Sequence, residues 1–218
     1  VSARALMAGI DMDMVGEGFL TTLAQSLKEG KITLAQIDNA CRLILEAKYI
    51  LGLFDNPYKY CNEQRAKTEI YTASHRKVAR EIAAQSFVLL KNQDDLLPLK
   101  KGGTIAVIGP LADNKKNMPG TWSVAANFDN AISVLTGIKE VAGAEAKVLY
   151  AKGSFLDDDS LLEKRAGMFG KDFFRDGKTK QQLLEEALAI AAQADVIIAA
   201  VGESAEMSGE SSSRTNID

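Results

Sequence analysis

Two short, continuously apolar runs constrain the fold of this chain more than any other feature. Residues 104–109 read Thr-Ile-Ala-Val-Ile-Gly, and residues 196–202 read Val-Ile-Ile-Ala-Ala-Val-Gly. Runs that are apolar at successive positions are typical of strands covered on both faces, as in parallel sheets. A third run, at residues 147–151, lies between them. We therefore expect three buried strands in this part of the chain.

Helical patterns separate these strands. One helical stretch is expected at about residues 131–141. Thr179 and Gln182 have the form of a capping box, which predicts that a second helix begins there and continues through Leu184 and Leu188. Strands that alternate with helices form parallel sheets with right-handed crossovers. The fold class predicted for this half is therefore α/β, with a doubly wound parallel sheet.

The first part of the chain is expected to be mostly helical. Phe19, Leu20, Leu23 and Leu27 form an apolar stripe, and Thr33 with Gln36 form another capping box. Residues 56–72 are polar and predict a linker. A helix is expected at residues 73–91, with Val78, Ile82, Ala83, Phe87 and Leu90 facing inward. The predicted organisation is one domain end at 1–55, the linker 56–72, and a second domain at 73–218, and both chain ends resemble cuts.

Composition excludes several classes of function. The formal net charge is −3, which argues against a nucleic-acid surface, because such a surface needs clustered Lys and Arg. No apolar run approaches the roughly 20 residues that span a membrane. Cys41 and Cys61 fit no zinc motif and are expected to be free thiols, and His75 has no metal-ligating neighbour in sequence. We expect neither a metal nor another cofactor.

Chemistry is expected in the loops that leave the strands at 104–109 and 196–202, because ligands bind beyond the carboxyl ends of parallel strands. The second loop holds Glu203, Glu206 and Glu210, followed by Arg214. Crowded carboxylates raise the pKa of at least one of them, and a raised pKa suits a general acid. The same composition also fits an acidic surface loop without catalytic function, and Arg214 could keep one carboxylate ionised.

The first of these loops holds Trp122 and Ser123 in the run Gly120-Thr121-Trp122-Ser123. An indole ring stacks well on the apolar face of a sugar, although a single Trp can equally be a core residue. Nucleotide binding is disfavoured, because neither the dinucleotide glycine fingerprint nor a P-loop is present.

An ordered series of motifs resembles glycoside hydrolase family 3. The C-terminal motif runs from Val201-Gly202-Glu203 through Gly209-Glu210 to Arg214. The other motifs are Ala8-Gly9-Ile10-Asp11-Met12-Asp13-Met14, Lys48-Tyr49 with Leu51-Gly52-Leu53-Phe54, Pro57-Tyr58, Ala84-Gln85-Ser86 with Val88-Leu89-Leu90-Lys91-Asn92, Leu97-Pro98-Leu99, and Ile105-Ala106-Val107-Ile108-Gly109-Pro110-Leu111-Ala112-Asp113. Gly120-Thr121-Trp122-Ser123 and Tyr150-Ala151-Lys152-Gly153 resemble the bacterial periplasmic β-glucosidase branch.

This resemblance implies the end of a (β/α)8 barrel followed by an α/β sandwich domain. It implies a retaining β-glycosidase that removes terminal glucose from oligosaccharides or β-glucosides and is periplasmic or secreted. Glu210 is then the acid/base, with Glu206 and Glu203 as competitors for that role. The residues expected to contact substrate are Trp122, Ser123, Glu206, Met207 and Arg214.

The nucleophile of the family is an Asp in a Ser-Asp-Trp-like motif that this sequence lacks, so it is expected upstream of Val1. The chain alone is therefore expected to be inactive, and its partner is the barrel of the same protein. Asp11 and Asp13 follow the expected barrel strand, where we predict a turn or helix-cap role for them. The alternative function is a non-catalytic α/β module that binds a carbohydrate or a partner chain.

Overall fold

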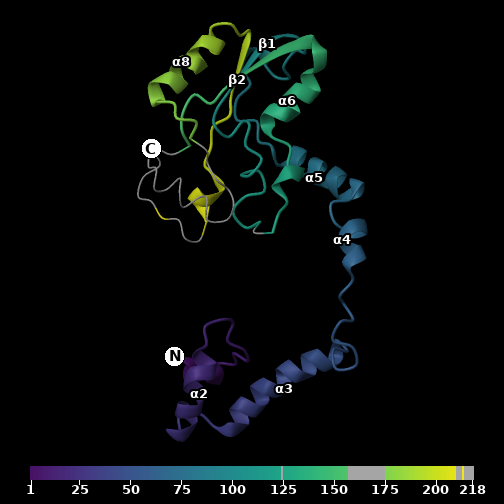
Figure 1. Ribbon diagram of the computed structural model, residues 1–218, viewed down its shortest axis with the longest axis vertical. Helices are drawn as coiled ribbons and strands as arrows, with labels where there is room; N and C mark the ends of the chain where they lie inside the picture. Colours follow the sequence, from purple (N-terminus) through teal and green to yellow (C-terminus); the bar gives the residue numbers. More distant parts are fainter. Residues whose placement is uncertain (124, 157–174, 210–212, 214–218) are drawn as a thin grey trace. The chain divides into compact units, whose positions relative to one another are not determined.

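The computed structural model describes residues 1–123, 125–156, 175–209 and 213 of the chain (Figure 1). It divides the chain into two compact units, Val1–Leu90 and Lys91–Asp218. This division concerns the present chain, and the domain boundaries expected at residues 55 and 73 stay predictions.

The first unit begins with three helices, α1 (Ser2–Met7), α2 (Gly18–Lys28) and α3 (Leu34–Ile50). The predicted capping box at the start of α3 is confirmed: the backbone N of Thr33 donates to Gln36 Oε1 at 2.9 Å, and Gln36 N donates to Thr33 Oγ1 at 3.3 Å. A small core joins the three helices and consists of Leu6, Leu23, Ile32 and Ala40. Leu20 was expected in the same apolar stripe as Leu23 but is 84% exposed, because this core covers only one narrow side of α2.

The segment between α1 and α2 differs from the expected barrel strand. Residues 8–14 form no strand. A strand is stabilised by hydrogen bonds to a neighbouring strand, and the described residues of the first unit contain no other strand to supply them. The helix-cap role predicted for Asp13 is confirmed, because its Oδ2 accepts a hydrogen bond from Phe19 N at 3.1 Å, within the first turn of α2.

Two further helices were only partly predicted. The region expected to be a plain linker contains α4 (Glu63–Glu69), whose N-cap Asn62 accepts from Gln64 N. Helix α5 (Ala73–Ser86) ends before the predicted residue 91. The expectation that its apolar residues face inward is wrong for this chain, since Ile82 is 62% and Phe87 81% exposed. Apolar spacing identifies the helix, but no described residue of the unit covers that face.

The second unit contains the predicted parallel sheet. Its strands are β1 (Gly103–Ile108), β2 (Ala146–Ala151) and β3 (Val196–Ala199), in the order β2-β1-β3. Both pairings are parallel. Strand β3 was expected to continue to residue 202, but its ladder with β1 ends at the pair Ile108–Ala199, because β1 itself ends there. The α/β prediction is thereby confirmed.

The crossovers place one helix on each side of the sheet (Figure 1). Helix α6 (Val134–Ala142) links β1 to β2, and α8 (Lys180–Ala191) lies between β2 and β3. The capping box predicted at Thr179 is confirmed, with Thr179 N donating to Gln182 Oε1 at 2.8 Å. Short 3-10 turns complete the unit at Gln93–Asp95 (η1), Phe128–Asn130 (η2), Gly143–Glu145 (η3) and Ala205–Ser208 (η5).

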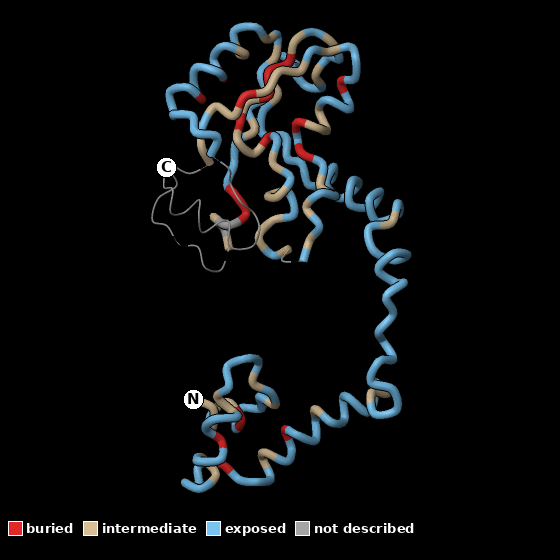
Figure 2. Tube along the Cα trace, viewed as in Figure 1, coloured by how far each residue is buried: buried red, intermediate tan, exposed pale blue. Residues whose placement is uncertain are grey.

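Burial in this unit is concentrated along β1 and its flanking helices (Figure 2). Ala106 and Val107 are completely buried at the centre of the sheet, and Leu183 of α8 is 1% exposed. This rigid centre supports the loops at the carboxyl ends of β1 and β3. No helix within the described ranges is long and apolar enough to cross a membrane.

Candidate active site

The strand order defines where a ligand site belongs. From the central strand β1 the chain crosses to β2 on one side, and it later returns past β1 to β3 on the other side. The strand order therefore reverses between β1 and β3, which makes the β1/β3 boundary the topological switch point of the sheet. In open α/β sheets, ligands bind outside the carboxyl ends of the strands at such a point.

Gly109 allows the two strand ends to come together at this boundary. Its φ is +141°, a conformation that favours glycine. A Cβ atom at this position would clash with the carbonyl oxygen of Ala200 and lie 2.9 Å from its carbonyl carbon. Beside it, Ala200 N donates to Ile108 O at 2.7 Å, and Gly109 N donates to Ala151 O at 3.1 Å. Both candidate loops thus leave the sheet from one tightly packed point.

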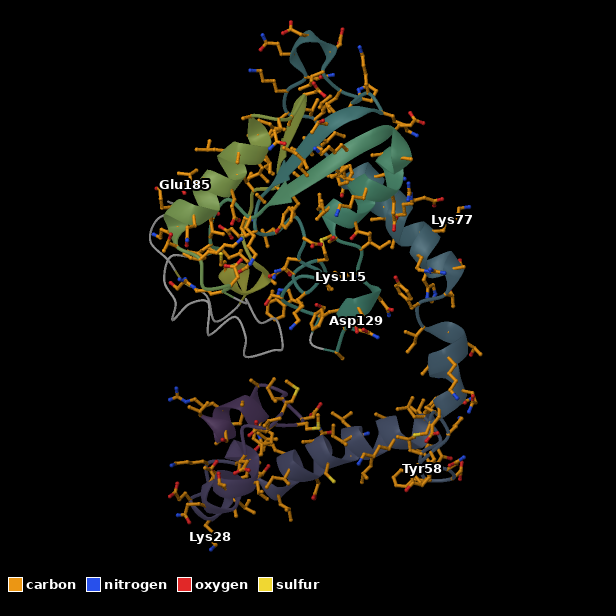
Figure 3. All side chains as sticks on the ribbon, turned by 45° about the horizontal axis from the view of Figure 1, so that its top comes forward. Lys28, Tyr58, Lys77, Lys115, Asp129 and Glu185 are labelled. Carbon is orange, nitrogen blue, oxygen red and sulfur yellow. The ribbon has the colours of Figure 1, made fainter. Side chains whose placement is uncertain are left out.

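The loop after β1, residues 109–133, is anchored at both of its ends. Leu135 N donates to Ala112 O at 2.8 Å, and the buried hydroxyl of Ser133 donates to Asp113 Oδ1 at 2.9 Å. Lys115 and Asp129 belong to the part of this loop that extends away from the sheet (Figure 3). These bonds fix the base of the loop against the start of α6.

The loop after β3 is fastened directly to the loop after β1. Asn117 Oδ1 accepts a hydrogen bond from Ala205 N at 2.8 Å, across 88 residues of sequence. Farther along, a Cβ atom at Gly209 would lie 3.0 Å from Thr121 Oγ1. The structure therefore brings together the two loops in which the sequence predicted the chemistry.

Within the first loop, Trp122 is 71% exposed, which excludes the core interpretation of this residue in the present chain. Ser123 is half-buried, and its hydroxyl donates to Gly120 O at 2.8 Å. Ser123 therefore closes the turn that presents Trp122, and an exposed indole on a closed turn can stack on a flat apolar face.

Within the second loop, Met207 lies in the turn η5, where its Sδ accepts from Ser204 N at 3.3 Å. The backbone of Glu206 lies in the same turn. Glu210 and Arg214 lie outside the described residues. The roles assigned to these four positions, and to Trp122 and Ser123, stay predictions.

Tyr150 at the end of β2 is a polar neighbour of this edge that the sequence analysis did not select. Its hydroxyl donates to Gly109 O at 3.4 Å. Burial, together with the smaller effects of the negative charges of Asp113 and Asp176, raises the pKa of Tyr150 to about 12. Tyr150 therefore remains a neutral hydrogen-bond donor beneath the loop. The sequence feature that could have identified Tyr150 is its position at the end of a predicted strand.

The asparagines Asn114 and Asn117 were also missed. Asn is a frequent turn residue because its side chain hydrogen-bonds nearby backbone, so two Asn residues shortly after a strand carried a weak signal. Their contact with the second loop could not be read from it.

The two cysteines and the single histidine lie in the first unit and not in the unit that holds this edge. Cys41 and Cys61 are free and exposed. Thr72 Oγ1 accepts from His75 N at the start of α5, which agrees with a helix-start histidine. No cluster of His, Cys, Asp and Glu suited to a metal occurs among the residues that the structure describes.

The fold and the paired loops define an α/β sandwich domain with its candidate ligand edge at the β1/β3 switch point. The sequence model of the glycosyl hydrolase family 3 C-terminal domain matches residues 87–218. The chain belongs to glycosyl hydrolase family 3, as its motifs predicted.

Individual relatives support this assignment. The chain is 43% identical over 216 residues to the periplasmic beta-glucosidase of Salmonella typhimurium, covering 98% of this chain and 28% of that protein. It is 33% identical over 226 residues to a beta-xylosidase of Formosa agariphila, again covering 98% and 28%. The chain thus spans little more than a quarter of the length of these relatives.

Solved structures agree in fold. The beta-glucosidase of Listeria innocua in complex with gluconolactone superposes with a TM-score of 0.73 at 28% identity, covering 96% of this chain and 25% of that chain. A beta-glucosidase involved in saponin metabolism from intestinal bacteria superposes with a TM-score of 0.76 at 30% identity, covering 96% and 29%.

Proposed function

We propose that this chain is part of a retaining, exo-acting β-glycosidase of the β-glucosidase type. The observation that carries the proposal is the direct fastening of the loop after β3 to the loop after β1 at the switch point, through Asn117 and Ala205. The first loop presents the exposed Trp122. In the second loop, Glu210 directly follows Gly209 in the sequence.

In the proposed mechanism Glu210 is the acid/base. Its carboxyl proton passes to the glycosidic oxygen while an Asp nucleophile, expected in a longer chain, attacks the anomeric carbon and the aglycone leaves. The resulting carboxylate of Glu210 then removes a proton from water, and this water hydrolyses the glycosyl ester and regenerates both residues. Such a retaining pair needs its carboxyl groups about 5–5.5 Å apart.

Substrate contacts are proposed for residues on both loops. Trp122 offers an apolar platform for a pyranose ring, and Ser123, Glu206, Met207 and Arg214 would line the remainder of the site. We propose glucose as the terminal sugar, because the relative with 43% identity is named a beta-glucosidase. A higher kcat/KM of the full-length protein for aryl β-xylosides than for aryl β-glucosides would contradict this assignment.

The first test replaces Glu210 in the full-length protein. Glu210→Ala should lower kcat on unactivated β-glucosides by about 10²–10⁴-fold, the usual contribution of general acid–base catalysis. Substrates with good leaving groups need no proton, so their glycosylation step should be spared. Azide should restore turnover and yield a β-glycosyl azide. Glu203→Ala and Glu206→Ala are the matched controls, and this pattern in Glu206→Ala alone would move the acid/base role to Glu206.

The second test concerns the chain by itself. It has no Ser-Asp-Trp motif to supply a nucleophile, so we propose that these 218 residues alone do not hydrolyse aryl β-glucosides. Turnover by the purified chain would refute this. A non-catalytic binding module would instead show sugar binding without turnover in the full-length protein as well. We also propose a periplasmic or secreted location, which fractionation of the native host would test.

A further inference from the structure

We infer that Asn117 is a positioning residue that sets the placement of the catalytic loop, by holding the turn Ser204–Gly209 against the loop after β1. The inference rests on the proposed function, because it assigns Asn117 an effect on the acid/base that follows this turn. Its basis is a set of three hydrogen bonds of Asn117, one from its backbone N and two that involve its side chain.

The first step is the orientation of the Asn117 side chain. Asn114 Oδ1 accepts hydrogen bonds from both the backbone N and the Nδ2 of Asn117, each at 3.1 Å. A carboxamide is planar, with its donor and its acceptor on opposite sides. Engaging Nδ2 with Asn114 therefore directs Oδ1 away from Asn114, and this oxygen meets Ala205 N at 2.8 Å.

The second step is the rigidity of the turn that Asn117 holds. Ser204 and Ala205 are only 4% and 7% exposed, although they lie in a loop. Met207 N donates to Ser204 O at 3.1 Å, and Ser204 N donates to Met207 Sδ at 3.3 Å. These hydrogen bonds close the turn on itself, so a contact that holds Ala205 in place holds the whole turn rather than one residue.

The third step links the turn to catalysis. Ala205 is the first residue of η5, and Glu210 follows five residues later in the sequence. Without Asn117, the two loops would lose the hydrogen bond from Ala205 N that joins them across 88 residues of sequence. A misplacement of about 1 Å of a reacting group can lower a rate about a hundredfold, so the anchoring point of the turn should influence proton transfer.

The experiment compares three substitutions in the full-length protein. Asn117→Ala removes the acceptor for Ala205 N. Asn114→Asp keeps the oxygen that orients Asn117 and should behave as the unaltered protein. Asn127→Ala is the matched control, because Asn127 lies in the same loop but accepts from Asp129 N, within its own turn.

Two substrates separate a positioning effect from general destabilisation. For an unactivated β-glucoside, Asn117→Ala should lower kcat about 10- to 100-fold with KM within about twofold. For a dinitrophenyl β-glucoside, which leaves without a proton, its glycosylation rate should stay within about threefold. Deuterium exchange of the Ala205 amide should become at least about tenfold faster. Equal losses on both substrates would overturn the inference, as would unchanged kinetics.

If Asn117→Ala does not fold, Asn114→Ala tests the same idea, since it leaves Asn117 in place but without its orienting partner. Failure of this inference is distinguishable from failure of the proposed function. If Glu210→Ala shows the expected dependence on the leaving group while Asn117→Ala leaves the kinetics unchanged, only the inference about Asn117 is overturned. Absence of that pattern in Glu210→Ala would overturn the proposed function.

Discussion

Replacing Gly109 by Ala tests the tight junction from which both candidate loops leave the sheet. Gly109 has a φ of +141°, and an added Cβ would meet the carbonyl group of Ala200. Holding a non-glycine residue in such a conformation costs on the order of 1–3 kcal/mol. Moving the Ala200 backbone aside also weakens the 2.7 Å bond from Ala200 N to Ile108 O, a further loss of about 1 kcal/mol.

We therefore expect Gly109→Ala to destabilise the second unit by about 2–4 kcal/mol. Gly137→Ala is the matched control with the opposite sign. Gly137 lies within α6, and an added Cβ would meet nothing within 4 Å. An open helical glycine replaced by Ala gains about 0.5–1 kcal/mol.

The assay is urea unfolding of the 218-residue chain combined with hydrogen exchange of the sheet amides, of which Val107 is the most central. Exchange at Val107 reports opening of the second unit separately from the first. A cost below about 1 kcal/mol for Gly109→Ala would refute the close approach of β1 and β3 on which the site is built. A destabilising Gly137→Ala would refute the open helical environment of α6.

Three further predictions concern the same unit. The pKa of Tyr150 is raised to about 12 in the folded chain, so as the pH rises above about 10 the unfolded chain loses this proton first. The stabilisation is therefore fully present below pH 10 and falls between pH 10 and 12, by about 1 kcal/mol after allowance for the partial exposure of the side chain. Tyr150→Phe should flatten this loss in urea titrations, whereas replacing the exposed Tyr58 by Phe should not. Thr179→Ala removes the N-cap that accepts from Gln182 N at 3.2 Å and should cost about 1 kcal/mol in the same assay, whereas Thr179→Ser should cost only a few tenths. Leu183→Ala should cost about 2–5 kcal/mol, because the side chain is 1% exposed and leaves a cavity; a loss below about 1 kcal/mol would contradict its burial.

The sequence predicted the second unit more accurately than the first. The cap at Thr179 and the strand at residues 103–108 follow from local chemistry and from continuous apolar runs, and both were predicted within a residue or two. The apolar face of α5 was predicted with equal reason, yet Ile82 is 62% exposed. Periodicity identifies which side of a helix is apolar, but it does not supply the surface that covers it.

The sequence by itself determined the α/β class, the positions of the helix caps, the family, and the two loops in which the candidate residues lie. These are encoded locally, by residue type and spacing. Only the tertiary structure decided that β3 lies beside β1, so that the switch point falls between these two loops. It alone paired Asn117 with Ala205 and exposed Trp122. The physical reason is that such contacts join residues far apart in the chain, and the spacing of either residue carries no information about the other.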